Sequence, residues 1–227
     1  MEILPVIDLK NGLAVHARGG DRANYQPLKS RFADSSHPLA LINGMNATMD
    51  LKTVYVADLD ALDGGKVQIE LLNELSDAFP QLRFVVDVGL KSGDEMAIGT
   101  APENVDLVIA SETLNSVDDY LALKSTLPDA HQILSLDRKG TECLGPTALF
   151  ETADLWPESV IHMNLAHVGG VLGPDFDGLR ALRKLAPRII LFAAGGVRNS
   201  DDLDRLSLSG VQGVLIGSAL HDGRVLP

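Results

Sequence analysis

Two short apolar segments near the C-terminus, residues 189–194 and 211–216, constrain the fold more than any other part of this sequence. Both are too short for a core helix and rich in β-branched residues, and both end at glycine. This pattern is typical of buried parallel strands. Glycines at the carboxyl ends of such strands let a ligand approach the backbone, and the N–H groups that follow can bind an anion. A single glycine pair would more often be only a tight turn, but two such ends favour a phosphate site formed by Gly195, Gly196, Gly217 and Ser218.

Segments with strand and helix patterns alternate along the rest of the chain. Strands are expected at 3–9, 54–57, 84–86, 107–110, 133–137 and 160–165, and helices at 38–49, 69–79, 93–98, 117–125, 147–152 and 176–185. With the two C-terminal strands, this order predicts an α/β fold, a (β/α)8 TIM barrel. A length of 227 residues suits a single domain spanning residues 1–227. The long polar segment over 18–36 is a candidate active-site loop.

An internal repeat indicates two fused half-barrels, about 1–128 and 129–227. Residues 105–114 align with 211–220, and residues 88–95 align with 195–202. The chain stops soon after the eighth strand, so we expect the last helix to be shortened or missing. The outer faces of the flanking strands would then lack a cover. A second subunit could supply it, so a homo-oligomer is possible.

Asp8 and Asp137 occupy corresponding places at the ends of strands one and five. In an eight-stranded barrel these strands face each other across the axis, and catalytic residues gather at their carboxyl ends. Two carboxyl groups that flank a substrate can divide the roles of general acid and general base. Either aspartate alone would more often cap a turn or helix. Their symmetric placement makes both candidate catalytic residues.

The acidic composition narrows the possible partners. A formal net charge of −12 and a pI near 4.8 argue against binding to nucleic acid or an anionic membrane. The sequence has no apolar stretch of membrane-spanning length and no internal disulfide, because Cys143 is its single cysteine. We therefore expect a cytoplasmic protein whose anionic ligand is held by local backbone dipoles.

Taken together, these motifs resemble the histidine-biosynthesis (β/α)8-barrel family, most of all its phosphoribosylformimino-aminoimidazole carboxamide ribotide isomerase branch. The similarity runs nearly end to end, through residues 4–12, 20–21, 58–60, 136–137, 173–174 and both glycine-ended strands. It implies an Amadori rearrangement of an aminoaldose phosphate to an aminoketose. In that reaction Asp8 would remove the C2 proton and Asp137 would be the acid that assists ring opening. No metal or organic cofactor is implied.

Departures from the family pattern indicate a divergent paralogue. The family substrate carries a second phosphate near strands three and four, where this chain has Asp87 and Glu112. A carboxylate repels a phosphate by about 1 kcal/mol per charge pair in water and by more in a cleft. We therefore expect no phosphate at this end. His16 also stands where the family tends to have arginine. The candidate substrate-binding residues are Lys10, Asp58, Asp87, Glu112, Asn164 and His167.

Three functions remain open on these grounds. The first is an isomerase-like enzyme acting on a phosphorylated sugar-like or amino-containing metabolite. The second is a Schiff-base lyase or synthase in one-carbon cofactor biosynthesis of the methanopterin or methanofuran type, with Lys10 or Lys139 as nucleophile. The third is a barrel that binds a phosphorylated ligand without catalysis.

Overall fold

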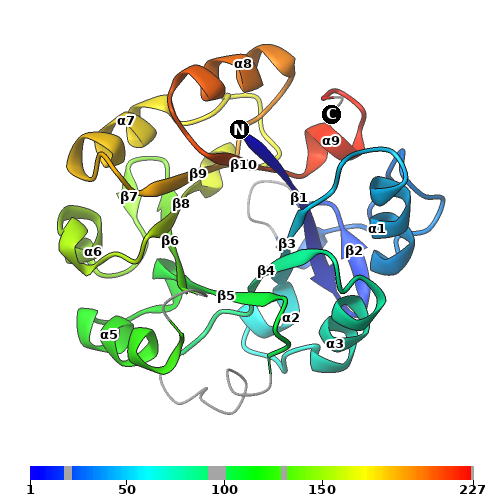
Figure 1. Ribbon diagram of the computed structural model, residues 1–227, viewed down its shortest axis with the longest axis horizontal. Helices are drawn as coiled ribbons and strands as arrows, with labels where there is room; N and C mark the ends of the chain where they lie inside the picture. The colour runs from blue at the N-terminus through cyan, green and yellow to red at the C-terminus, as the bar shows by residue number, and fades with distance from the viewer. Residues whose placement is uncertain (18–21, 92–100, 129–131, 226–227) are drawn as a thin grey trace.

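A closed barrel of parallel strands forms the centre of the molecule (Figure 1). The computed structural model describes residues 1–17, 22–91, 101–128 and 132–225. Within these residues, eight strands are parallel, and β10 pairs with β1 to close the ring. They are β1 (Glu2–Lys10), β3 (Thr53–Asp58), β4 (Arg83–Asp87), β5 (Val105–Ala110), β6 (Gln132–Lys139), β8 (Ser159–Asn164), β9 (Ile190–Ala194) and β10 (Gly213–Ile216). Two short antiparallel strands extend the sheet, β2 (Leu13–Val15) on β1 and β7 (Glu142–Cys143) on β6. The predicted (β/α)8 barrel is confirmed.

Helices surround the strands on the outside (Figure 1). They are α1 (Pro38–Asn46), α2 (Leu59–Leu62), α3 (Ile69–Ala78), α5 (Val117–Thr126), α6 (Thr147–Glu151), α7 (Phe176–Leu185), α8 (Ser200–Leu208) and α9 (Ser218–His221). Single 3-10 turns are η1 (Arg22–Asn24), η2 (Ser111–Thr113), η4 (Ala153–Leu155) and η5 (Leu165–His167). The structure describes none of residues 93–98, where a helix is predicted, and none of 18–21 in the first loop. Across the described segments, no helix has the length and apolarity needed to cross a bilayer.

The ends of two helices, α1 and α9, can be compared directly with the predictions from the sequence. The helix predicted over 38–49 ends at Asn46, because the Thr48 hydroxyl donates to the carbonyls of Gly44 and Met45 and satisfies the last turn. The helix after β10, α9, is only four residues long. The predicted shortening of the last helix is confirmed.

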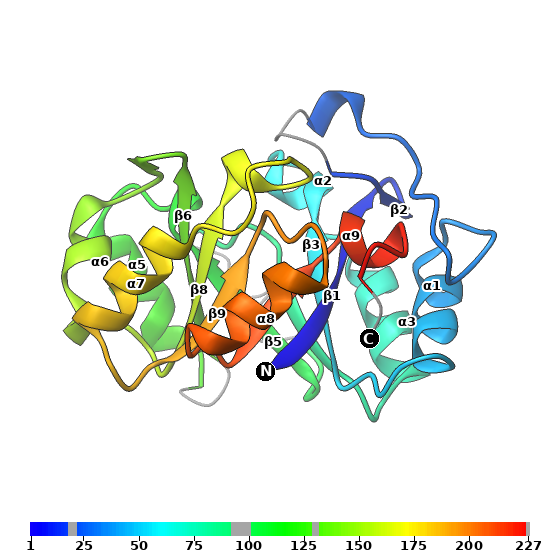
Figure 2. The same cartoon turned by 90° about the horizontal axis from the view of Figure 1, so that it is seen from above.

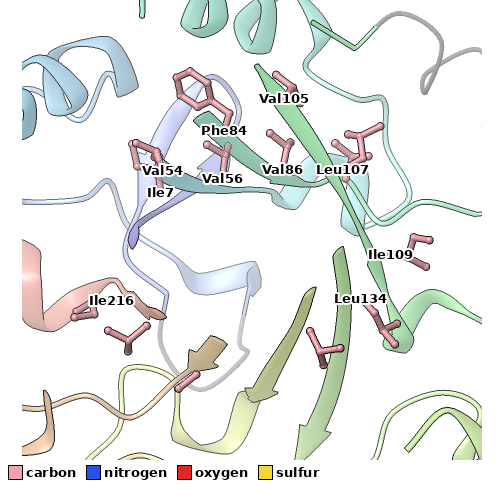
Figure 3. Packing of buried hydrophobic residues seen from close by; sticks show 14 of the residues in the cluster. Ile7, Val54, Val56, Phe84, Val86, Val105, Leu107, Ile109, Leu134 and Ile216 are labelled. Carbon is pink, nitrogen blue, oxygen red and sulfur yellow. The ribbon is translucent and has the colours of Figure 1, made fainter. Parts of the chain in front are cut away.

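Successive side chains along each strand point alternately outward and inward, so the barrel has two apolar layers. Outward-facing side chains such as Ile7, Val56 and Val86 are completely buried against the helices (Figure 3). Inward-facing side chains such as Val85 and Ile161 form a second buried cluster inside the barrel. Each such aliphatic side chain contributes about 1.5–3 kcal/mol through burial. The two layers fix which residues of each strand face the barrel axis.

The strand register then sets the level of the inward-facing groups at the carboxyl ends. Asp8 on β1 lies beside Ala57 on β3, which lies beside Asp87 on β4. On the other wall, Asp137 of β6 lies level with Met163 of β8. Figure 2 shows the same barrel from the side, with β2 and α2 near one end and the N-terminus at the other. Because β1 and β6 are four places apart in a ring of eight, the two predicted catalytic aspartates lie on opposite walls.

Candidate active site

A cavity of about 550 Å³ opens at the carboxyl ends of the strands. The predicted catalytic and phosphate-binding residues all line it, and so do two of the six predicted substrate-binding residues. These residues are Asp8, Asp137, Gly195, Gly196, Gly217, Ser218, Asp87 and Glu112. The structure therefore gathers into one space the groups that the sequence places at the ends of six strands. In (β/α)8 barrels this end of the strands holds the active site.

Asp137 is held rigidly by neighbouring donors. Ser135 donates to Oδ1 at 2.6 Å, while the Ser111 hydroxyl and the Glu112 backbone N–H donate to Oδ2 at 3.1 and 3.2 Å. Burial raises the pKa of Asp137 to about 6, the negative charge of Glu112 adds to this effect, and the three hydrogen bonds oppose it. Asp137 is therefore fixed in position and able to carry a proton near neutral pH.

Asp8, on the opposite wall, has a different environment. Its carboxyl group has no hydrogen-bond partner among the residues that the structure describes, and it lines the cavity. Burial raises the pKa of Asp8 to about 7, and the positive charge of Arg22 partly opposes this shift. A carboxyl group with these properties can accept a proton from a bound molecule without first breaking a bond to the protein.

Asp87 and Tyr55 form a buried pair between the two walls. The Tyr55 hydroxyl donates to Oδ2 of Asp87 at 3.3 Å, and the Gly89 backbone N–H donates to Oδ1 at 2.9 Å. Burial raises the pKa of Asp87 to about 7, and the charge of Asp137 raises it further. The pKa of Tyr55 lies well above its ordinary value, because burial and the nearby carboxylates both disfavour its anion. Tyr55 therefore stays a neutral hydrogen-bond donor.

Arg22 joins the first loop to the far wall of the cavity. Its guanidinium group contacts Glu112 at 3.0 Å and Asp63 at 3.4 Å. These partners raise the pKa of Arg22, although burial opposes the shift. The predicted contribution of the segment over 18–36 to the site is therefore carried by Arg22, and also by Tyr25 and Leu28, which line the cavity.

The turn after β9 has a backbone that only glycine fits. Gly195 and Gly196 have φ values of +90° and +86°. A side chain at Gly196 would collide with the backbone of Gly173 and Pro174. At the start of α9, the Ser218 hydroxyl lies 3.1 Å from Nε2 of His16. Gly195, Gly196, Gly217 and Ser218 therefore form one side of the cavity.

Four predicted substrate-binding residues do not line the cavity. Asp58 is fully buried and caps α2 by accepting from the Ala61 N–H, and it also binds the backbone and side chain of Gln68. The Lys10 ammonium group donates to the Arg22 carbonyl at 2.6 Å. Both residues therefore stabilise local structure.

Asn164 and His167 are also used for structure near the end of β8. The Asn164 amide bonds to the backbone N–H and carbonyl of Gly140 and donates to Asp175. Nδ1 of His167 lies 2.5 Å from the Gly173 carbonyl. These contacts fix the loops that border the cavity.

Four further residues take part in the site without a clear signal in the sequence, two on the cavity wall and two behind Asp137. Tyr55 could have been predicted, because it lies two residues before Ala57 on the same strand and therefore faces the same side of the sheet. The hydroxyl donors to Asp137 are Ser111, directly after β5, and Ser135, within β6, and neither carries a distinctive motif. Arg22 reaches the site through the path of its loop, for which the sequence gives no signal. Within the described ranges, no group of three or more histidine, cysteine, aspartate or glutamate side chains is arranged to hold a metal ion.

The closed ring with its cavity at the strand ends places the protein among the (β/α)8 barrels. The chain belongs to the histidine biosynthesis protein family, whose model matches residues 2–226. This match confirms the resemblance seen in the sequence.

Relatives of known sequence cover nearly the whole chain. An uncharacterized protein of Methanocaldococcus jannaschii is 28% identical over 228 residues, covering 98% of this chain and 94% of the relative. The 1-(5-phosphoribosyl)-5-((5-phosphoribosylamino)methylideneamino)imidazole-4-carboxamide isomerase of Listeria welshimeri is 27% identical over 250 residues, covering 99% and 95%. The isomerase of that name from Aquifex aeolicus is 26% identical over 238 residues, covering 98% and 94%. The family of this chain therefore includes named isomerases.

Proposed function

We propose that this protein is an isomerase of the aldose–ketose type that acts on an amino-containing sugar phosphate with one phosphate group. The observation that carries the proposal is the pair of opposed carboxyl groups in one cavity, one without a hydrogen-bond partner among the described residues and one held by three donors. Their pKa values of about 7 for Asp8 and about 6 for Asp137 suit proton transfer near neutral pH.

The proposed reaction moves protons between these two groups and the substrate. Asp137 donates a proton to the ring oxygen, which opens the ring and leaves a cationic imine at C1. Asp8 then removes the proton from C2, and the electron pair of that bond neutralises the imine to give an enolamine. Tautomerisation of the enolamine yields the aminoketose, so the reaction consumes no oxidant or reductant. The imine itself accepts the electrons, so the steps require no metal or organic cofactor.

The two ends of the cavity differ in the charge they favour. Gly195, Gly196, Gly217 and Ser218 offer a neutral backbone cradle, which suits a phosphate group. At the other end, Asp87 and Glu112 present carboxyl groups to the cavity. Glu112 is already paired with Arg22, and Asp87 becomes negative as the pH rises through about 7. A second phosphate there would have to compete with Glu112 for Arg22 and would be repelled by Asp87 above neutral pH, whereas a hydroxyl or ammonium group would not. The substrate is therefore expected to carry a single phosphate.

Hydrogen exchange at C2 tests this proposal. Aminoaldose monophosphates incubated with the protein in D2O are expected to gain deuterium at C2 and to convert to ketose, both followed by mass spectrometry. Asp8→Asn and Asp137→Asn should each lower turnover by about 10²–10⁴-fold. Asp50→Asn, whose side chain is 87% exposed and lies outside the cavity, serves as the matched control. Unchanged turnover in both cavity variants would refute the proposed roles.

A Schiff-base enzyme is the second candidate, and one observation favours it. Lys139 lines the cavity on the strand that carries Asp137, whereas Lys10 does not line it. A lysine amine there could attack a carbonyl carbon and release water to form an imine. Borohydride reduction in the presence of carbonyl substrates would then attach the substrate mass to Lys139. Absence of such an adduct, with isomerisation intact, would exclude this alternative.

A further inference from the structure

His16 connects the first loop to the proposed phosphate turn. Its Nε2 lies 3.1 Å from the Ser218 hydroxyl, although 202 positions separate the two residues in the chain. His16 follows the antiparallel strand β2, which returns the chain over the end of β1. Its imidazole lines the same cavity as Gly195, Gly196 and Gly217. A titratable group thus lies directly against the hydroxyl that would face the anion.

We propose that His16 is an anion-binding residue and that its protonation strengthens phosphate binding at this end of the cavity. The proposal rests on the phosphate site of the proposed function and adds a residue and a pH dependence to it. Imidazole changes its charge between pH 5 and 8, unlike the arginine and lysine side chains that usually bind phosphate.

Because His16 is hydrogen-bonded to Ser218, protonation of His16 favours anion binding in two ways, through its charge and through the orientation of the serine hydroxyl. When His16 is protonated, Nε2–H donates to the Ser218 oxygen, so the serine hydroxyl is free to donate its own hydrogen to an anion. When Nε2 carries no hydrogen, it accepts the serine hydrogen, which is then withdrawn from the anion. Protonation therefore adds a positive charge and at the same time turns a hydroxyl donor toward the ligand.

A second titratable group near His16 is His221. His221 is buried, its ring contacts the Val6 carbonyl and the Ser30 hydroxyl, and burial lowers its pKa, so it remains neutral near pH 7. A positive charge on His16 lowers the pKa of His221 further.

Fixed charges also surround His16. Arg224 lines the cavity and pairs with Asp222 at 3.1 Å. Asp222 and Lys29 share a second hollow with His16, while Asp8 and Arg22 line the main cavity. Arginine and lysine keep their charge between pH 5.5 and 8.5. Asp8 becomes negative as the pH rises through about 7 and would weaken anion binding in the same window, so the test needs variants that isolate His16.

Sulfate is the probe, because it stays doubly charged across this pH range. Any pH dependence of its binding therefore comes from titration of the protein. Binding is measured by isothermal titration calorimetry from pH 5.5 to 8.5. The wild-type affinity is expected to fall by about tenfold over this window, the ratio between a charge-assisted and a neutral hydrogen bond. His16→Gln keeps a side-chain donor but no titratable charge, and it should bind as weakly at pH 5.5 as the wild type does at pH 8.5. His16→Arg should bind tightly throughout.

Two controls separate this inference from the proposed function. Asp8, Asp87 and Asp137 also titrate between pH 5.5 and 8.5 and line the cavity, so the assignment rests on a comparison: a pH dependence that persists in Asp8→Asn but disappears in His16→Gln belongs to His16. His37→Gln changes a histidine outside the cavity and should match the wild type. If the wild type binds no sulfate even at pH 5.5, the phosphate site itself is wrong and this inference falls with it. If sulfate binds and His16→Gln retains the wild-type affinity at pH 5.5, only the role of His16 is refuted.

Discussion

We expect Asp87→Asn to raise the free energy of unfolding, and to raise it more as the pH increases. Asp87 is only 6% exposed, and burial moves its pKa from 3.8 to about 7. As the pH rises through this interval, the unfolded chain ionises while the folded protein keeps its proton, so the wild type loses stability. Asparagine does not titrate, so the variant avoids this loss. Its gain should be about 2 kcal/mol at pH 5 and level off at about 4 kcal/mol above pH 7, as upper limits.

The geometry allows asparagine to keep both hydrogen bonds of Asp87. Its amide oxygen can still accept from the Gly89 N–H, and its amide nitrogen can donate to the Tyr55 hydroxyl. The gain therefore reports removal of a buried charge and not a change in packing.

Urea unfolding followed by fluorescence of Trp156, the single tryptophan, provides the assay. Asp202→Asn is a control of opposite sign, because Arg198 lowers the pKa of Asp202 and its carboxylate stabilises the fold. This control should lose stability at pH 8, and the loss should shrink as the pH falls through the lowered pKa of Asp202. If Asp87→Asn is no more stable than the wild type at pH 8, then Asp87 is not a desolvated, poorly compensated carboxyl group, and the reasoning from its burial is wrong.

Two further substitutions test the cavity. Gly196→Ala should abolish sulfate binding, because a methyl group there collides with the Gly173 carbonyl oxygen; Gly210→Ala, with a similar φ of +79° but open space around it, should cost only about 1–2 kcal/mol of stability and leave binding intact. Equal loss of binding in both glycine variants would contradict the assignment of the turn. Tyr55→Phe removes a donor to the Asp87 carboxylate and should raise the pKa of Asp87 above about 7, as measured by carbon-13 NMR of the aspartate carboxyl groups. An unchanged pKa would show that this hydrogen bond has no effect on the ionisation of Asp87.

The barrel could be predicted because buried parallel strands leave a clear signal. Residues on both faces of such strands are covered, so segments such as residues 107–110 are continuous apolar runs with no polar face. The helix ends are harder to predict. The side chain of Thr48 ends α1 early by bonding to its carbonyls, and its sequence context does not distinguish this use from an ordinary helical threonine.

The candidate site was predictable where strand parity decides the direction of a side chain. Asp8 shares the inward face with Val6, and Asp137 shares it with Ser135, so both point into the barrel. The side chain of Asp58 points to the outside of the barrel, because Asp58 lies beside Leu9, whose side chain faces outward. Counting positions from the strand centre would have separated these cases.

Residues that reach the site through loops were not predictable in this way. The positions of His16 and Arg22 depend on the antiparallel return of β2 and on ion pairs with residues distant in sequence. Such contacts form only once the barrel is closed, because a loop of this length has no local pattern that fixes its path. His16 is noticeable in the sequence only as a departure from the family pattern.

The donors to Asp137 have a consequence for how the protein could change over time. Two of the three come from Ser111 and Glu112, which lie on the other side of the predicted half-barrel boundary at residues 128 and 129. Replacing residues 1–128 by the corresponding half of a relative without a hydroxyl at position 111 would remove one of the donors that hold this carboxyl group. The position of Asp137 in one predicted half therefore depends on the residue at position 111 in the other, and a hydroxyl at that position is what we expect a functional swapped barrel to need.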